Sequence, residues 1–252
     1  MTKDREKDKQ GPVTEEERKE MRAKIGQLLW LGRQTRPDLL FDASSLSTRT
    51  NKAVVQDLID TNKAMKKAVS EKVTLTFQKL ENPEMRVYSD SSLGNLHDEG
   101  TQGGYFICLQ GKGNYMTPLA WSCQKLKTVV RSSLAGETLA MADAMDNGIY
   151  LASLFSEISS GEVQPEILRM SLITDNQSLL DNLTTNKAVT EKRLRVEIAA
   201  IKEARERKEV KDVIWVSTEN QLADVLTKKG VSPIRLLAAL EEGRPRRYQE
   251  TV

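Results

Sequence analysis

The spacing of hydrophobic positions changes about a third of the way along the chain. Residues 1–20 alternate Lys, Arg, Asp and Glu with almost no apolar side chain, and this pattern predicts a disordered, charged leader. Apolar side chains then recur at helical spacing over residues 21–34, and two further helices are expected over 39–46 and 54–69. Residues 21–72 are therefore predicted to form a small helical segment.

Beyond this segment the apolar positions alternate as they do in strands. The strand-like runs cover residues 73–77, 85–89, 104–109 and 116–122. The first two runs alternate, the third is a short apolar run, and turn residues 111–114 lead into the fourth, so together they suggest an antiparallel meander. The elements expected next are a long helix over about 133–159, a strand over 167–174, a short helix over 177–183, a charged helix over 190–208, a strand over 213–216 and a last helix starting near residue 221.

This order of elements predicts an α/β fold, with a mixed sheet that carries helices on both faces. The α/β domain is expected to occupy residues 73–230. Residues 231–252 are expected to form a C-terminal helix and tail.

Composition narrows the class of protein only slightly. The 252 residues carry a formal net charge of +2, so a nucleic-acid surface would have to come from local clusters of Lys and Arg. Two cysteines, Cys108 and Cys123, exclude a disulfide framework and a cysteine-based zinc site. No run of apolar residues approaches the length of a membrane helix, and the N-terminus is too polar for a signal peptide, so we expect a soluble intracellular protein.

Four acidic residues stand where predicted elements begin or end. Asp90 and Asp175 end predicted strands, whereas Glu137 and Asp224 lie near the starts of predicted helices. Each has an ordinary structural explanation: a turn aspartate for Asp90, a helix cap for Asp175, and a favourable interaction with the helix dipole for the other two. Taken together, they are expected to meet at one end of the sheet, where open α/β sheets place their chemistry.

Four uncompensated carboxylates repel one another, and a divalent cation relieves that repulsion. No His or Cys joins them, and an all-oxygen ligand set favours Mg²⁺ or Mn²⁺ over Zn²⁺. The sequence therefore predicts a metal site formed by Asp90, Glu137, Asp175 and Asp224.

Basic residues lie next to two of these acidic motifs. Lys125, Lys127 and Arg131 lead into the long helix that carries Glu137, while Lys192 and Arg193 open the charged helix. We expect these five side chains to contact nucleic-acid phosphates without reading bases. Asn176, next to Asp175, is expected to help place the substrate. The only histidine, His97, is expected to be a solvated loop residue without a role in the site.

The motifs around the acids occur in the order of a known family. They are Tyr88-Ser89-Asp90-Ser91, Gly103-Gly104-Tyr105, Ala120-Trp121-Ser122-Cys123-Gln124-Lys125, Ser132-Ser133 with Gly136-Glu137, Thr174-Asp175-Asn176-Gln177 and Gln221-Leu222-Ala223-Asp224-Val225-Leu226-Thr227-Lys228. This series resembles the ribonuclease H domain at the C-terminus of copia-type retrotransposon Pol polyproteins. Upstream, Ile25-Gly26-Gln27-Leu28-Leu29-Trp30-Leu31 with Thr35-Arg36-Pro37-Asp38 resembles the thumb and connection region of the reverse transcriptase. The resemblance covers about residues 20–230.

The resemblance implies a ribonuclease H-like fold with a five-stranded mixed sheet and cleavage of the RNA strand of an RNA–DNA hybrid. It implies that the four acids are catalytic and bind two Mg²⁺ ions, for which Mn²⁺ can substitute. One ion would activate water for in-line attack, and the other would stabilise the leaving 3′-oxygen. The implied partners are the hybrid and the reverse transcriptase part of the same polyprotein, in a cytoplasmic virus-like particle or in the nucleus.

The chain differs from the usual pattern of this family in two ways. No palm segment with polymerase aspartates is present, so we expect no polymerase activity. The family usually carries a Lys-His pair where this chain has Glu191-Lys192-Arg193-Leu194.

Two other functions stay open at the level of sequence. One is a non-catalytic module that binds hybrids or supports a polymerase, and the other is a fragment of a decayed element. The retained set of four acids argues against the first alternative and does not separate the second from an active nuclease.

Overall fold

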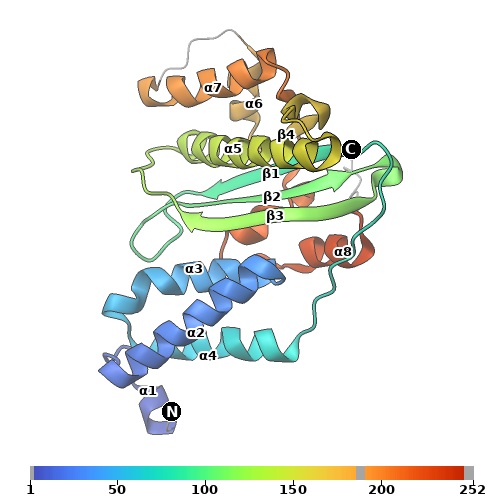
Figure 1. Cartoon of the computed structure of the whole chain (residues 1–252). Helices are drawn as coiled ribbons and strands as arrows, with labels where there is room; N and C mark the ends of the chain where they lie inside the picture. The colour runs from blue at the N-terminus through green and yellow to red at the C-terminus, as the bar shows by residue number, and fades with distance from the viewer. Residues whose placement is uncertain (1–2, 186–190, 247–252) are drawn as a thin grey trace.

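The computed structural model describes residues 3–185 and 191–246, and within them a five-stranded sheet forms the centre of the molecule (Figure 1). The strands are β1 (Glu84–Ser92), β2 (Gln102–Gln110), β3 (Met116–Lys125), β4 (Met170–Thr174) and β5 (Val210–Trp215). Their order is β3-β2-β1-β4-β5. The first three strands form an antiparallel meander, and β4 and β5 run parallel to β1. The predicted five-stranded mixed sheet with helices on both faces is confirmed.

One face of the sheet is covered by the long helix α5 (Ser133–Ser160), with α6 (Gln177–Thr184) and α7 (Arg195–Glu206) beside and above it (Figure 1). α5 begins at a cap, because Ser132 Oγ accepts a hydrogen bond from Ala135 N at 3.1 Å, and it ends at Gly161. Many small side chains on α5 let it lie close to the strands, and they share a core with Val87 and Ile107.

The opposite face is covered by α3 (Leu40–Arg49), α8 (Ile234–Glu242) and the short helical turn η7 (Asp224–Leu226). Leu40 and Phe41 from α3 share a second core with Tyr88 and Phe106 from the sheet. Alternate residues of β1 and β2 therefore face different cores, as the two-residue period of a strand requires. Because α3 comes from the N-terminal segment, this segment packs directly onto the sheet.

The N-terminal segment comprises four α-helices within the described residues: α1 (Lys3–Lys7), α2 (Glu15–Gln34), α3 and α4 (Val55–Ser70). The short turns η1 (Pro37–Leu39) and η2 (Thr50–Lys52) connect its longer helices. A buried ion pair joins Arg36 Nε to Asp38 Oδ1 at 2.8 Å, and Arg36 also donates to the carbonyl of Glu71 at 2.8 Å. This contact links the turn after α2 to the end of α4.

The prediction of disorder for residues 1–20 was wrong for the described part of that range. Helix α1 and the start of α2 lie there, and Val13 is buried in a cluster with Met21. Two contacts explain the order: a capping box, in which Thr14 Oγ1 accepts from Glu17 N at 3.2 Å, and an ion pair of 2.9 Å between Arg5 and Glu17. Composition alone did not reveal a charge pairing across twelve residues.

The strand-like run over residues 73–77 does not join the sheet. Thr76 N donates instead to the Leu240 carbonyl at 2.9 Å, so this extended segment runs along α8. Close by, Thr117 Oγ1 of β3 bonds both the N–H and the carbonyl of Gln78, each at 2.9 Å. β3 is the edge strand of the sheet on this side, and it carries Pro118, which has no N–H to donate to a further strand.

Other element boundaries differ from the predictions by several residues. β4 begins at Met170, after the short turn η4 (Pro165–Ile167), and α7 is preceded by η5 (Lys192–Leu194). The expected helix near residue 221 is replaced by the turns η6 (Thr218–Asn220) and η7, and the last helix starts at Ile234. The described tail stops at residue 246, so residues 247–252 of the predicted tail lie outside the described residues. None of the helices in the described ranges combines the length and apolar character needed to cross a membrane.

Candidate metal centre

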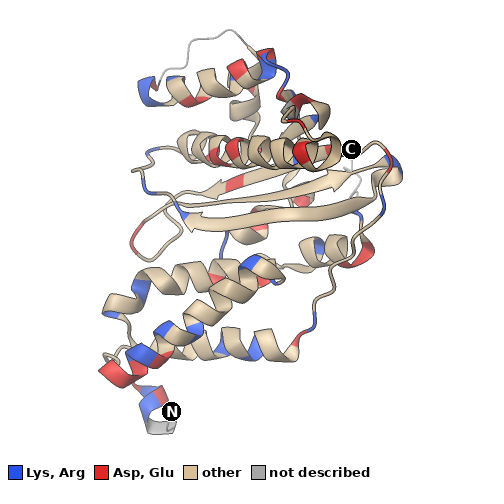
Figure 2. Ribbon diagram, in the orientation of Figure 1, with Lys and Arg blue, Asp and Glu red and all other residues tan. Residues whose placement is uncertain are grey.

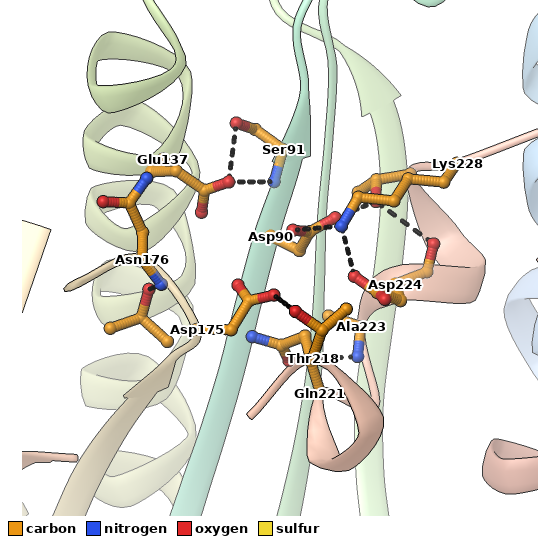
Figure 3. A network of polar contacts seen from close by, with 12 residues as sticks. Asp90, Ser91, Glu137, Asp175, Asn176, Thr218, Gln221, Ala223, Asp224 and Lys228 are labelled. Carbon is orange, nitrogen blue, oxygen red and sulfur yellow. Dashed lines mark hydrogen bonds and ion pairs between the residues drawn. The ribbon is translucent and has the colours of Figure 1, made fainter. Parts of the chain in front are cut away.

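Two of the four acids stand at corresponding positions of neighbouring parallel strands. The register of β1 and β4 pairs Tyr88 with Ile173, so two residues further on Asp90 and Asp175 lie side by side (Figure 3). Asp90 is completely buried, whereas Asp175, just beyond the end of β4, is partly exposed. Asp175 Oδ2 accepts a hydrogen bond from Thr218 Oγ1 at 3.0 Å. The carboxyl ends of parallel strands thus form one wall of the site.

The third acid, Asp224, is brought to these strands by a turn instead of by a long helix. Gln221 Nε2 donates to the carbonyl of Ser89 at 3.0 Å, while Gln221 Oε1 accepts from Ala223 N at 3.2 Å. This buried amide therefore joins the turn to β1 directly before Asp90.

A glycine in β2 makes room for the same turn. Gly104 lies opposite Asp90 in the sheet, and a Cβ at this position would approach Leu226 Cβ and Thr227 Cγ2 to 3.0 Å. A larger residue would push the turn away from the sheet. The Gly103-Gly104 motif thus has a geometric role in assembling the acids.

Asp90, Asp175 and Asp224 each place one carboxylate oxygen within 4.8 Å of the others. Lys228 lies at the same site, with its Nζ 3.2 Å from Asp90 Oδ1 and 2.5 Å from Asp224 Oδ1 (Figure 3). Thr227 Oγ1 donates to the second oxygen of Asp90. The structure therefore brings three of the four predicted ligands together, and two of them contact the same lysine.

Glu137 lies beside this group of three but is not a member of it. Its Oε1 accepts hydrogen bonds of 3.3 Å from both the backbone N and the Oγ of Ser91, whereas its Oε2 is buried without a partner (Figure 3). Gly136 allows this approach, since a Cβ there would lie 2.5 Å from Ser91 Oγ. A buried carboxylate oxygen with no partner is costly, and a cation would satisfy it.

Burial raises the pKa of the Asp90 carboxyl group to about 7, and the nearby Asp224 adds to the rise while Lys228 opposes it. Burial also raises the pKa of Glu137 well above its ordinary value, with a further contribution from Asp90. The pKa of Asp224 is raised by burial in spite of its hydrogen bond to Lys228. Without a metal, the cluster is therefore short of positive charge.

These shifts predict how pH affects the metal-free protein. The Asp90 carboxyl group has an ordinary pKa of 3.8 in the unfolded chain and a pKa of about 7 in the fold, so the unfolded chain releases its proton first as pH rises. The stability that Asp90 contributes therefore falls between these two values. Lys228, whose pKa is raised, keeps its proton in both states over that range.

We expect the wild-type melting temperature in EDTA to fall relative to that of Asp90→Asn as pH rises through this range. Thermal unfolding followed by circular dichroism, at pH values on both sides of it, gives the measurement. The comparison with Asp90→Asn removes the contributions of acids outside the cluster. The prediction is contradicted if the difference in melting temperature between the wild type and Asp90→Asn stays constant as pH rises, or if it grows in favour of the wild type.

The basic residues predicted to contact nucleic acid lie outside the acidic cluster. Lys127 and Arg131 are exposed in the connection between β3 and α5, where basic positions are visible at the left of Figure 2. Lys192 and Arg193 are exposed in η5. Lys125 is paired with Asp98 in the β1–β2 connection.

One contact joins these two basic segments. Ser132 Oγ donates to Glu191 Oε2 at 3.3 Å, and this places η5 beside the start of α5. Asn176 caps α6, since its Oδ1 accepts from Leu179 N at 2.9 Å, so its amide has a structural role as well as the predicted contact with substrate. His97 is exposed, as expected for a loop residue.

Ser91 and Thr218, which bond Glu137 and Asp175, had no role in the sequence-based prediction. The same holds for Gln221, Thr227 and Lys228, which belong to the motif that contains Asp224. The spacing of four between Asp224 and Lys228 was the available signal, because residues so spaced meet on one side of a helical turn. The contact of Lys228 with Asp90, 138 residues away, had no local signal.

A mixed sheet with acids gathered near the ends of its parallel strands is the arrangement expected of a ribonuclease H-like fold. No protein-family model matches the sequence. The chain is similar to part of the retrovirus-related Pol polyprotein from transposon RE1 of Arabidopsis thaliana, with 25% identity over 211 residues. The alignment covers 83% of this chain and 14% of the polyprotein. The predicted resemblance to a retrotransposon Pol polyprotein is thereby confirmed.

Solved structures with related architecture include cellular and viral proteins. LC11-RNase H1 in complex with an RNA/DNA hybrid is 14% identical, with a TM-score of 0.41, over 57% of this chain and 93% of that one. RNase H1 from Halobacterium salinarum is 17% identical, with a TM-score of 0.39, over 57% and 93%. The foamy viral protease-reverse transcriptase in complex with an RNA/DNA hybrid is 12% identical, with a TM-score of 0.47, over 92% of this chain and 28% of that one. The chain thus spans a small part of the transposon and foamy viral proteins that it matches.

Proposed function

We propose that this chain is the ribonuclease H portion of a copia-type retrotransposon Pol polyprotein. Its activity would be hydrolysis of the RNA strand of RNA–DNA hybrids, dependent on Mg²⁺ or Mn²⁺. The similarity to the Arabidopsis polyprotein supports this context, and the order of the acidic motifs supports the copia type.

A single observation carries the proposal: the carboxylates of Asp90, Asp175 and Asp224 lie within 4.8 Å of one another at the carboxyl ends of parallel strands. An arrangement of three carboxylates serves no packing purpose, because like charges at this distance repel and two of the three are buried. It is suited to cations with a preference for oxygen ligands.

The residues present fit a divalent metal. All candidate ligands are carboxylates, and the unpartnered Oε2 of Glu137 adds a further buried donor atom beside the group of three. Asp90, Asp175 and Asp224 would hold the metal, with Glu137 as the additional ligand. A bound divalent cation would neutralise these carboxylates and supply Lewis-acid chemistry for phosphodiester hydrolysis.

Protein side chains would position the substrate around this centre. Lys127 and Arg131 are exposed in the connection before α5, and Lys192 and Arg193 are exposed in η5, which the contact between Glu191 and Ser132 places beside the start of α5. Their exposed charges are suited to phosphate contacts that orient a duplex without reading its sequence. These contacts would place the scissile strand over the acids.

The test is cleavage of a hybrid in which the RNA strand is labelled. We expect the chain to cut the RNA strand in Mg²⁺, to leave the DNA strand intact, and to lose activity in EDTA. Duplexes of RNA alone and of DNA alone serve as matched substrates and should remain uncut. Tight binding of the hybrid without cleavage would favour a non-catalytic binding module, and neither binding nor cleavage would favour a decayed fragment.

A further inference from the structure

The ammonium group of Lys228 lies where a cation bound to the acids would be expected. Its Nζ contacts Asp90 Oδ1 at 3.2 Å and Asp224 Oδ1 at 2.5 Å, so it bridges two of the three carboxylates (Figure 3). The remaining oxygen of Asp90 accepts from Thr227 Oγ1. Both oxygens of Asp90 are therefore engaged by groups of this chain alone.

Asp90 and Lys228 differ in their access to solvent. The Asp90 side chain is 1% exposed, whereas that of Lys228 is 32% exposed. Water thus cannot compensate the charge of Asp90, and a neighbouring cation stabilises its ionised form. Lys228 follows η7 at the surface, so its long side chain can turn outward while the buried carboxylate stays in place.

We propose that Lys228 is a built-in counter-ion that bridges Asp90 and Asp224 in the metal-free protein and leaves this position when a divalent cation binds. The inference rests on the proposed metal site and assigns its metal-free state to a residue of this chain. An ammonium group and a divalent cation would compete for the carboxylates of Asp90 and Asp224, because the two cations repel each other and both bind carboxylate oxygens.

The competition has two consequences. Lys228 lowers the affinity of the site for a divalent cation, because its own contacts must first be broken. It also stabilises the fold in the absence of metal, because it reduces the repulsion between the buried acids. Loss of the lysine should therefore tighten metal binding and weaken the metal-free fold at the same time.

Mn²⁺ titration of the whole chain without nucleic acid tests the proposal, with bound metal followed by the loss of the free Mn²⁺ signal in electron paramagnetic resonance. Lys228→Met should bind Mn²⁺ about tenfold more tightly than the wild type or more, as expected for removal of a like charge in direct contact. In EDTA its melting temperature should be lower than that of the wild type, and saturating Mn²⁺ should remove most of that difference. If Lys228→Met unfolds in EDTA, Mn²⁺ is expected to restore its fold.

Lys229→Met is the matched control, because Lys229 is the next residue, carries the same charge and is exposed. It should bind Mn²⁺ with nearly the wild-type affinity. If Lys228→Met binds Mn²⁺ only as tightly as the wild type or more weakly, the counter-ion role is overturned, but the proposed nuclease function is not. A Lys228→Met variant that stays unfolded in Mn²⁺ would have the same consequence. Absence of Mn²⁺ binding in the wild type and every variant would overturn the metal site itself, and with it the proposed function.

Discussion

Asp90→Asn is expected to cut the RNA strand of a hybrid at least about a hundredfold more slowly than the wild type, the loss typical of one preorganised electrostatic contact. Asp90 is the most buried of the three clustered acids and contacts Thr227 and Lys228. Asparagine keeps the shape of the side chain but removes its negative charge, so the affinity for a divalent cation falls. Single-turnover cleavage in saturating Mg²⁺ measures the chemical step directly.

Asp212→Asn is the matched control for this variant. Asp212 lies on β5 and is exposed, so the substitution changes the same charge on the same sheet without touching the site. It should retain the wild-type rate. Circular dichroism should show both variants folded, and an active Asp90→Asn variant would show that the clustered acids do not perform the reaction.

Leu40→Ala is expected to lower the free energy of unfolding by about 2–5 kcal/mol, the usual cost of removing a large buried side chain. Leu40 belongs to the N-terminal segment, is 1% exposed, and packs with Phe106 and Leu226 against the sheet. The cavity would therefore form between α3 and the sheet, below the turn that carries Asp224. Urea denaturation followed by circular dichroism and by tryptophan fluorescence measures the loss.

Of the three tryptophans, Trp121 reports on this interface, because its Nε1 donates to the Gly32 carbonyl at 2.7 Å. Val69→Ala in α4, where the side chain is 83% exposed, is the control and should change stability by no more than about 0.5 kcal/mol. If Leu40→Ala has the same free energy of unfolding as the wild type, the packing of α3 against the sheet is contradicted.

The elements around the site were predictable because their signals are local. The alternation in β1, the apolar run in β2, the cap at Ser132 and the strand before Asp175 can all be recognised within a few residues, and their order predicted the mixed sheet. The predictions failed where distant contacts replace local preference. Arg5 and Glu17 order a segment that composition marked as disordered, and the segment around Thr76 follows α8 instead of the sheet.

The same division applies to the candidate site. The identity of the four acids, and their places at the ends of elements, depended on sequence alone, since strand ends and helix starts are local features. The spacing of Asp90, Asp175 and Asp224 depended on the tertiary structure, because it follows from the register of β1 with β4 and from the close approach of η7 that Gly104 allows.

The tertiary structure also determined the charge balance of the site. It turned Glu137 toward Ser91, placed Lys228 between two buried aspartates, and packed α3 under the sheet. These contacts join residues far apart along the chain, and their strength depends on burial, which no local pattern specifies. Sequence by itself identified the carboxylates that could serve as metal ligands, and the fold decided how closely they meet and which lysine lies between two of them.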